Sequence, residues 1–486
     1  MKYLRIARWL LAGTLALTNA QLQIPLTPSR DSTTAPFSVR EQTPELCDAG
    51  SRYFTGEINI TSEKSMFFWY FESRHEPETD PLVLWMSGGP GATGELGCFI
   101  GTGPCAVNDD GNSTRRLEYS WTDRANVIYI DQPIGVGFSQ ITNRSSIAVN
   151  LQDGARDIYR FLISLTTDVF PHLAGRPWHI TGESMGGHYV TGYTEYIARF
   201  ERENAALGIE PRINISSAVI VDGYIDALWQ VIGYYDFFCT DWRRDGRYAP
   251  LMNETACAEM AAGVPTCEAM RRHCQESYDT KACRAAIEVC NETVGRFYEQ
   301  EVQPGGWDPY DDRHTCESPP LCSNFAHGAT WQFFNQPWVQ RSLGFAEDYS
   351  FELIDFDTND RWVAAENLYL PVTRELTWIL DNTNVRVLFV NGNNDIIINT
   401  PGQMRMLDEL PWKEQAVYRS LGYENWYFKN GELASDRGGA SNGVRQGGFW
   451  KGTERLAFYA VDEAGHFSPS HQPEAIGAVL RTWLRE

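Results

Sequence analysis

A serine lies between two glycines in the stretch GESMG at 182–186. Residues 177–181 before it read as a buried strand, and residues 185–200 after it have the spacing of a helix. Glycines at these places allow a sharp turn and close packing behind it, so the hydroxyl of Ser184 would be presented as a nucleophile. The same letters recur around Ser441, but no strand precedes that serine and no helix follows it. Ser184 is therefore the predicted nucleophile.

A serine nucleophile needs a general base and an acid that orients the base, and candidates for both follow later strands. Asp395 follows the strand-like run VRVLFVNG, and His466 follows the last strand-like run, at 455–465. Taken alone, Asp395 could cap a helix, and His466 could be a loop histidine with His471 as a rival base. The order serine, acid, histidine predicts that His466 takes the proton of Ser184 while Asp395 orients the imidazole.

Attack on a carbonyl creates an oxyanion that must be stabilised by N–H groups held in place beforehand. The main chain of Met185, directly after the nucleophile, is the first predicted donor. The second is expected in the loop WMSGGPG at 85–91, where Gly89 is the candidate. A loop of this composition on its own would be only a turn, and the triad beside it favours the oxyanion role.

Strand-like and helix-like runs alternate along most of the chain. Strand-like runs lie at 66–73, 81–88, 126–133, 177–181, 215–223, 385–392 and 455–465, and helix-like runs lie at 148–170, 185–200 and 473–484. This alternation predicts an α/β protein with a mostly parallel sheet, and the order of the triad predicts the α/β-hydrolase fold. From 226 to about 325 the chain is helix-biased and rich in cysteine, which predicts an inserted cap.

The chain begins with a stretch typical of a secretory signal peptide that is cut after Ala20. Lys2, Arg5 and Arg8 precede an apolar run that is too short for a membrane anchor. The expected division is a signal peptide at 1–20, an N-terminal arm or propeptide at 21–46, the first part of the hydrolase core at 47–225, the cap at 226–325 and the second part of the core at 326–486.

The formal net charge of the 486-residue chain is −22. Proteins that bind nucleic acid or anionic membranes present a basic face, so this charge argues against both partners. We expect a secreted protein, and the sequence leaves its oligomeric state open.

Secretion would place the eleven cysteines in an oxidising compartment. Eight of them lie between Cys239 and Cys322 without a Cys-x-x-Cys pair, which favours a disulfide-stapled insert over a zinc site. The odd total leaves at least one thiol free or paired between molecules, and the pairing among Cys47, Cys98 and Cys105 stays open. Six Asn-x-Ser/Thr sequons are candidate glycosylation sites: Asn59, Asn112, Asn143, Asn214, Asn253 and Asn291.

Five longer stretches extend these motifs from about residue 50 to the end of the chain: FFWYFESRHEPETDPLVLWMSGGPG, ANVIYIDQPIGVGFS, ITGESMGGHYV, LFVNGNNDIIINTPG and AGHFSPSHQPEAI. Together they resemble the serine carboxypeptidases, a secreted or vacuolar family of α/β hydrolases. The resemblance implies removal of one C-terminal residue from a peptide at acid pH, with no metal or organic cofactor. It also implies the cap disulfides Cys239–Cys257, Cys267–Cys290, Cys274–Cys283 and Cys316–Cys322.

The resemblance further implies a cluster that binds the free carboxylate of the substrate, and the chain keeps only part of it. Trp85, Gly88 and Glu183 match the family pattern. Ser87 stands where the family has asparagine, and Gly101 stands where it has glutamate. Three other departures are Met185 in place of tyrosine, Ala92 in place of cysteine and Ile398 in place of a thiol.

Three functions therefore stay open. The first is a secreted carboxypeptidase that acts on peptides. The second uses the same chemistry as an acyltransferase or esterase on a small acyl substrate, which Ser87 and Gly101 favour. The third is a non-catalytic homologue, which the complete triad disfavours.

Overall fold

The computed structural model describes residues 36–242, 250–299, 305–317, 321–322, 328–434 and 443–485. The expected signal peptide at 1–20, the first part of the expected arm and the serine at 441 lie outside these residues. The described residues all belong to one compact unit.

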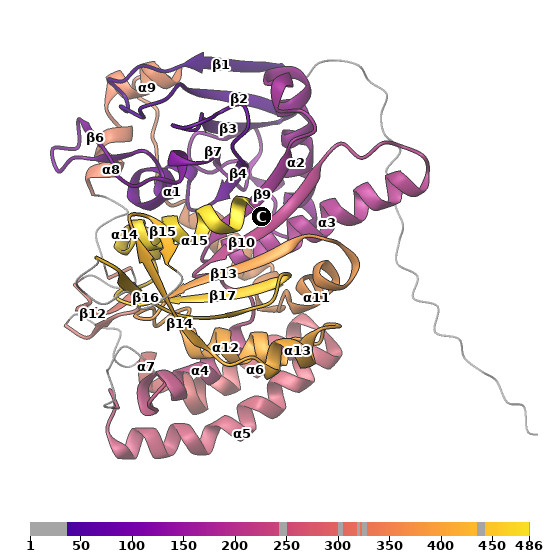
Figure 1. Ribbon diagram of the computed structural model, residues 1–486, viewed down its shortest axis with the longest axis vertical. Coiled ribbons are helices and arrows are strands. Elements are labelled where there is room, and N and C mark those ends of the chain that lie inside the picture. Colours follow the sequence, from indigo (N-terminus) through magenta and orange to yellow (C-terminus); the bar gives the residue numbers. More distant parts are fainter. Residues whose placement is uncertain are drawn as a thin grey trace, which may run out of the picture. The chain divides into compact units, whose positions relative to one another are not determined.

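A single large sheet organises the described chain (Figure 1). Twelve of its thirteen strands follow the order β1-β2-β3-β7-β4-β9-β10-β13-β17-β16-β14-β15, and the thirteenth, β8, pairs with β3. The strands are β1 (Phe37–Glu41), β2 (Tyr53–Thr61), β3 (Lys64–Phe71), β4 (Leu82–Met86), β7 (Asn126–Ile130), β8 (Gln140–Ile141), β9 (Pro177–Glu183), β10 (Asn214–Val221), β13 (Arg386–Gly392), β14 (Glu424–Lys429), β15 (Glu432–Ala434), β16 (Arg445–Gly452) and β17 (Leu456–Val461). Two small hairpins pair β5 (Cys105–Val107) with β6 (Thr114–Arg116) and β11 (Trp307–Asp308) with β12 (Asp311–Thr315).

Fifteen α-helices accompany the strands. They are α1 (Gly94–Gly97), α2 (Leu151–Ser164), α3 (Gly186–Ala206), α4 (Ala227–Cys239), α5 (Glu254–Ser277), α6 (Thr280–Cys290), α7 (Arg296–Glu299), α8 (Ala329–Phe334), α9 (Pro337–Leu343), α10 (Phe356–Ala364), α11 (Thr373–Asn382), α12 (Thr400–Glu409), α13 (Gln415–Ser420), α14 (Ser468–His471) and α15 (Pro473–Arg485). Two π-helical turns also matter below: η1 (Cys98–Thr102) and η6 (Asn291–Gly295).

The middle of the sheet is parallel. Strands β7, β4, β9, β10, β13 and β17 are parallel neighbours, whereas the strands on either side of them are antiparallel. All carboxyl ends of the parallel strands therefore meet at one edge of the sheet, where the loops that follow them can build a common site.

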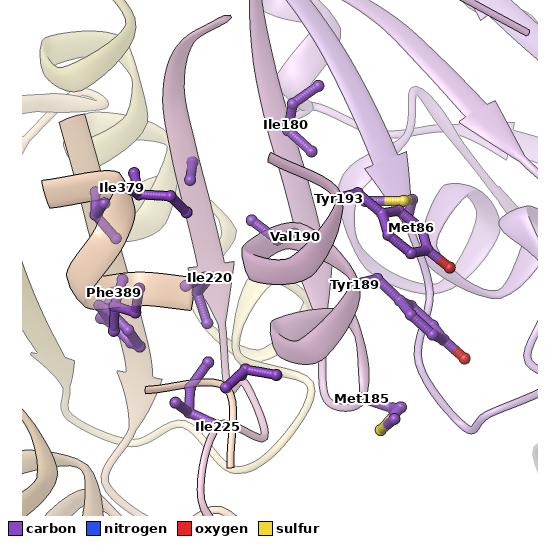
Figure 2. Close-up of a cluster of buried hydrophobic side chains, with 14 of the residues drawn as sticks. Met86, Ile180, Met185, Tyr189, Val190, Tyr193, Ile220, Ile225, Ile379 and Phe389 are labelled. Atoms are coloured by element: carbon purple, nitrogen blue, oxygen red, sulfur yellow. The ribbon is translucent and has the colours of Figure 1, made fainter. Parts of the chain in front are cut away.

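Both faces of the parallel strands are buried, which explains why they read as continuous apolar runs. Along β7, Val127 and Tyr129 pack into one hydrophobic cluster, and Ile128 packs into the other. Figure 2 shows side chains of α3, among them Val190, packed with Ile180 of β9 in the second cluster. Helix α3 therefore packs on the sheet against β9, the strand that precedes it.

Helices α4 to α7 follow β10 in the stretch 226–325, where the cap was expected, and they lie beside α12 and α13 in Figure 1. Four disulfides staple this part of the chain, and they are the pairs that the resemblance implied: Cys239–Cys257, Cys267–Cys290, Cys274–Cys283 and Cys316–Cys322. A fifth disulfide joins Cys47 to Cys105, and Cys98 is free and buried.

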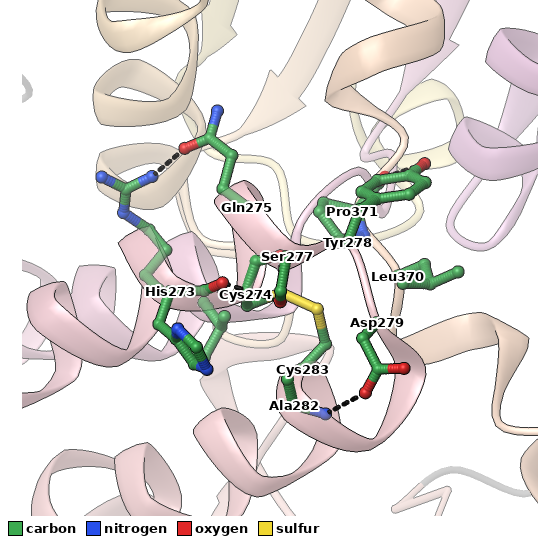
Figure 3. Close-up of a disulfide and its surroundings, with 12 residues drawn as sticks. His273, Cys274, Gln275, Ser277, Tyr278, Asp279, Ala282, Cys283, Leu370 and Pro371 are labelled. Atoms are coloured by element: carbon green, nitrogen blue, oxygen red, sulfur yellow. Dashed lines mark hydrogen bonds between the residues drawn. A yellow bond between two sulfur atoms is a disulfide. The ribbon is translucent and has the colours of Figure 1, made fainter. Parts of the chain in front are cut away.

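The turn between α5 and α6 shows how the cap is folded locally (Figure 3). Tyr278 ends α5 in a left-handed conformation with φ of 50°, and Asp279 caps α6 by accepting a hydrogen bond from the N–H of Ala282 at 3.0 Å. The Cys274–Cys283 disulfide bridges the two helices beside this turn. The Tyr278 hydroxyl donates to the carbonyl of Pro371 at 2.9 Å, so the hairpin is also tied to the core.

Candidate active site

Ser184 occupies a tight turn between β9 and α3. Its φ of 61° lies in the left-handed region that side chains other than glycine rarely adopt. A Cβ at Gly182 would lie 2.8 Å from the carbonyl oxygen of Met86, and a Cβ at Gly186 would lie 2.9 Å from the same oxygen. Both glycines are therefore needed for the turn to pass β4, which is the physical basis of the motif.

Asp395 and His466 are in direct contact. The Nδ1 atom of His466 lies 2.7 Å from Oδ2 of Asp395, and the two side chains are buried. The other carboxylate oxygen of Asp395 accepts from the N–H of Ile398 at 3.0 Å, and the N–H of His466 donates to the carbonyl of Tyr310 at 2.7 Å. Because Nδ1 faces the carboxylate, Nε2 is the ring nitrogen left to exchange a proton with a substrate or nucleophile.

The three residues Ser184, Asp395 and His466 follow β9, β13 and β17, whose carboxyl ends share one edge of the sheet. His471, the rival base, has a different environment. Its Nδ1 accepts from the N–H of Gly465 at 3.0 Å and lies 3.8 Å from Asp311, so it supports the loop that carries His466.

The charges around His466 favour its protonated form. Burial alone would lower the pKa of the imidazole. The charges of Asp395, Asp222 and Glu183 raise it and together outweigh burial. The pKa of His466 is raised to about 9 while these carboxylates are ionised, and protonation of Glu183 in acid removes its part of the rise, which favours the neutral imidazole that a general base needs. A buried imidazolium facing a carboxylate is the state that a general base passes through after it takes a proton.

Glu183 precedes the nucleophile and is buried. Burial raises its pKa to about 7, although His466 opposes the rise. The carboxyl group is therefore protonated in acid and can then donate a hydrogen bond.

The other residues expected to bind a carboxylate lie around the same turn. A Cβ at Gly88 would lie 2.7 Å from the N atom of Met185, so the loop 85–91 passes directly against the turn. The Nε1–H of Trp85 donates to Oγ of Ser87 at 3.2 Å, and both side chains are buried. Gly101 lies on η1, and a Cβ there would lie 3.4 Å from the N atom of Ser470, which is in α14 four residues after His466.

A pocket of about 330 Å³ opens beside Ser184. Gly89 and Met185, the two expected oxyanion donors, line it together with Ser184. The cap contributes Tyr298 and Asn291, and none of the described residues that line the pocket carries a charge. Asn291 was expected as a glycosylation acceptor and is half-buried here, whereas the other five sequon asparagines are exposed.

One residue of this region, Asp222, was not predicted from the sequence. Asp222 lies directly after β10, the strand between β9 and β13, and its side chain is buried among the loops described above. An acidic residue near the end of a predicted buried strand, between the strands of the nucleophile and of the acid, was the available signal.

Among the described residues, no group of three His, Cys, Asp or Glu side chains is arranged to hold a metal ion. The described helices are too short or too polar to cross a membrane.

A long parallel sheet with helices on both faces and a left-handed serine turn is the architecture of the α/β hydrolases. The family model for serine carboxypeptidases matches residues 44–486. Carboxypeptidase Y homolog A of Sclerotinia sclerotiorum is 30% identical over 437 residues, which are 90% of this chain and 72% of that protein. The corresponding Aspergillus niger protein is 30% identical over 439 residues, 90% of this chain and 73% of that protein.

Among solved structures, the prohormone-processing carboxypeptidase Kex1Δp of Saccharomyces cerevisiae superposes with a TM-score of 0.72 at 20% identity and covers 92% of this chain and 95% of that one. The chain belongs to the serine carboxypeptidase family. The predicted fold class, the family resemblance and the assignment as a serine hydrolase are thereby confirmed.

Proposed function

We propose that the protein is a secreted serine carboxypeptidase that removes C-terminal residues from peptides at acid pH through Ser184, His466 and Asp395. The observation that carries this proposal is the buried 2.7 Å contact between His466 Nδ1 and Asp395 Oδ2, at the sheet edge where β9 delivers Ser184 in its left-handed turn.

The proposed reaction has two halves. The Ser184 Oγ atom bonds to the scissile carbonyl carbon while its proton passes to Nε2 of His466. The imidazolium gives this proton to the amide nitrogen, the C–N bond breaks and the C-terminal amino acid leaves. Water then adds to the acyl carbon, its proton passes through His466 back to Ser184 Oγ, and the shortened peptide is released.

The main-chain N–H groups of Gly89 and Met185 are the proposed oxyanion donors. Both residues line the pocket beside Ser184, and the φ of 104° at Gly89 is one that residues with a Cβ rarely adopt. Donors fixed in the main chain need no rearrangement when the negative charge develops.

The proposed carboxylate site consists of Trp85, Ser87, Gly88 and Glu183. Because the oxygen of Ser87 accepts from Trp85, its own hydrogen is left to donate to a substrate carboxylate. Glu183 can donate only while protonated, and its pKa of about 7 supports a preference for acid conditions. The uncharged pocket further supports substrates whose side chain beside the scissile bond is uncharged.

A second candidate is an esterase or acyltransferase that acts on a small molecule. It is favoured by Gly101, which offers no side chain where the family pattern has a carboxylic acid. The space beside Gly101 is open enough for a Cβ, with the closest heavy atom at 3.4 Å, so the absent side chain is not replaced by a neighbour at this point.

The two functions are separated by turnover of a blocked dipeptide acid, its amide and its ester between pH 4 and 8. Carboxypeptidase activity predicts that the free acid is hydrolysed at acid pH and loses its advantage as the pH rises. Turnover of the ester with no hydrolysis of the acid would favour the second candidate. Ser184→Ala is the inactive variant, and Ser441→Ala is the matched control.

The remaining proposals concern processing and organisation. We propose a signal peptide at 1–20, an arm or propeptide at 21–46, and a cap at 226–325 between two parts of the core at 47–225 and 326–486. The boundary at 226 is supported by Asp226, which caps α4 by accepting from the N–H of Leu228 at 2.9 Å. N-terminal sequencing of the secreted protein tests the first cut.

Glycosylation is proposed at the five exposed sequons, Asn59, Asn112, Asn143, Asn214 and Asn253. Asn291 is half-buried in the pocket wall, so we expect its sequon to be unoccupied in the active protein. Mass spectrometry of peptides after enzymatic deglycosylation in heavy-oxygen water identifies the occupied asparagines.

A further inference from the structure

Asp222 follows β10 and has a φ of 43°, a left-handed conformation that is costly for a residue with a Cβ. Its side chain is fully buried. A strained conformation at a buried acid persists only where the neighbouring groups fix the residue in place. The hydrogen bonds of Asp222 therefore show which segments it connects.

The main chain of Asp222 contacts the nucleophile turn and the acid strand. Its carbonyl oxygen accepts from the N–H of Ser184 at 3.1 Å, and its N–H donates to the carbonyl of Val390 in β13 at 2.8 Å.

The side chain contacts the loops of the acid and of the base. Oδ1 accepts from the N–H of Gly392 at 2.6 Å, three residues before Asp395. Oδ2 is hydrogen-bonded to the hydroxyl of Ser468, two residues after His466, and lies 3.4 Å from the N–H of Ser468. One residue therefore contacts all three loops that carry the proposed triad.

We propose that Asp222 is a positioning residue that fixes the loops of Ser184, Asp395 and His466 relative to one another through its carbonyl and both carboxyl oxygens. This proposal deepens the proposed function and rests on it. Asp222 acts through the other residues, because its hydrogen bonds are to the main chain of the loops and to Ser468.

The protonation state of Asp222 follows from its surroundings. Burial raises the pKa of its carboxyl group well above the ordinary value, and Asp395 raises it further, while His466 opposes the rise. The hydroxyl of Ser468 donates to Oδ2, and the N–H of Gly392 donates to Oδ1. A carboxamide has the same shape: its oxygen can accept from Gly392 and its N–H can donate to the Ser468 oxygen, so asparagine is the substitution that preserves positioning without a titratable group.

The test is the rate at which Ser184 is modified by a fluorophosphonate. In this reaction the serine oxygen bonds to phosphorus, fluoride leaves with the P–F electron pair, and the serine proton passes to His466. The readout reports activation of the nucleophile and does not depend on whether the natural substrate is a peptide acid or an ester. Absence of Ser184 labelling in the wild type would overturn the triad and this proposal together, whereas labelling without peptide hydrolysis would overturn only the proposed substrate.

Asp222→Ala should slow the labelling by about 30-fold or more, while Asp222→Asn should stay within about threefold of the wild type, because small displacements of reacting groups cost large factors in rate. For the substrate that is turned over, the loss should appear in kcat with little change in KM. Ser468→Ala removes one contact without touching the carboxyl group and should give an intermediate loss. Asp157→Ala, which deletes a buried acid in α2 that pairs with Lys64, should lower the Tm and leave the labelling rate unchanged.

Normal labelling in Asp222→Ala would overturn the proposal. Equal losses in Asp222→Asn and Asp222→Ala would also overturn it, because a negative charge and not the hydrogen-bonded position would then be the required property. If Asp222→Ala fails to fold, the labelling rates of Ser468→Ala and Asp222→Asn test the proposal instead. A wild-type rate in Ser468→Ala, or a large loss of rate in Asp222→Asn, would contradict a positioning role for Asp222.

Discussion

The carboxyl groups of Glu95 and Asp131 are both buried and interact electrostatically with each other. Oε1 of Glu95 accepts from the indole N–H of Trp69 at 2.7 Å, and Oε2 of Glu95 has no hydrogen-bond donor. Both oxygens of Asp131 accept main-chain N–H groups at 2.7 Å, from Gly94 and from Phe138. Two interacting carboxyl groups in a buried site favour one proton shared between them, because their charges repel each other when both are ionised.

The first prediction is that this pair makes the protein less stable as the pH rises. Burial raises the pKa of Asp131 well above its ordinary 3.8, and the charge of Glu95 raises it further. A raised carboxyl pKa contributes stability that is complete below the ordinary pKa and is lost as the pH rises through the folded one. The Tm should therefore fall from pH 4 toward pH 8.

Glu95→Gln tests the contribution of the pair. The introduced amide can accept from Trp69 and donate to Asp131, so no proton has to be shared, and the loss of stability between pH 4 and pH 8 should shrink by on the order of 1–3 kcal/mol. Exposed Glu424→Gln is the control. A parallel displacement of the whole Tm profile by Glu95→Gln, with its slope unchanged, would refute the shared proton.

The second prediction concerns the triad. Ser184→Ala or His466→Ala should reduce kcat by about six orders of magnitude on the precedent of other triads. Asp395→Asn should cost about four orders of magnitude with the fold intact, because the imidazole loses its orienting acceptor. Steady-state kinetics and circular dichroism measure the two effects. Loss of activity in Ser441→Ala with none in Ser184→Ala would show that the wrong serine has been assigned.

The third prediction concerns the pH dependence of binding to a free carboxylate. Below a pH of about 7 Glu183 is protonated and can donate to the substrate; above it the anion repels a carboxylate. The kcat/KM ratio of a peptide acid to its ester should therefore fall as the pH rises through about 7. In Glu183→Gln the ratio should become flatter over this range. A wild-type ratio that stays constant from pH 4 to 8 would exclude Glu183 from carboxylate recognition.

The fourth prediction is that the double variant Ser87→Asn plus Gly101→Glu improves peptide acids selectively. One added hydrogen bond to a charged group contributes about 1.5–3 kcal/mol, which is about tenfold or more in kcat/KM at acid pH. Each single variant serves as the matched control for the other. Equal gains for the acid and the ester would mean that these positions do not contact the substrate carboxylate.

The fifth prediction concerns the cysteines. Peptide mapping without reduction should recover the four cap disulfides and Cys47–Cys105, and it should find the thiol of Cys98 modified only after denaturation, because that side chain is buried. Rapid alkylation of Cys98 in the native protein, or a Cys98–Cys105 disulfide, would contradict the structure.

The sequence allowed the parallel strands to be predicted because both of their faces are buried and most of their residues are therefore apolar. It did not reveal β1, whose residues are mostly exposed and which is held to β2 by main-chain hydrogen bonds that leave no apolar pattern. The antiparallel β14 was missed for a similar reason, since only two of its six residues are buried.

The residues of the candidate site were also only partly predictable from the sequence. The turn at Ser184 was predictable because its requirements are local: a serine, two glycines and the adjoining strand and helix. The role of Asp222 was not, because its side-chain partners Gly392 and Ser468 lie 170 and 246 residues further along the chain. The pairing of Cys47 with Cys105 likewise depends on the folded arrangement of two distant loops.

The pocket beside Ser184 is assembled from two separate stretches of chain. Loops of the sheet supply Gly89, Ser184 and Met185, while Ile287 and Asn291 come from α6 and η6 of the disulfide-stapled cap. The nucleophile and part of the pocket wall are thus encoded in different segments of the gene. Substitutions in the cap segment can therefore change the pocket wall while Ser184 and the proposed oxyanion donors stay unchanged. A chimera that carries a relative's cap is the natural starting point for new specificities.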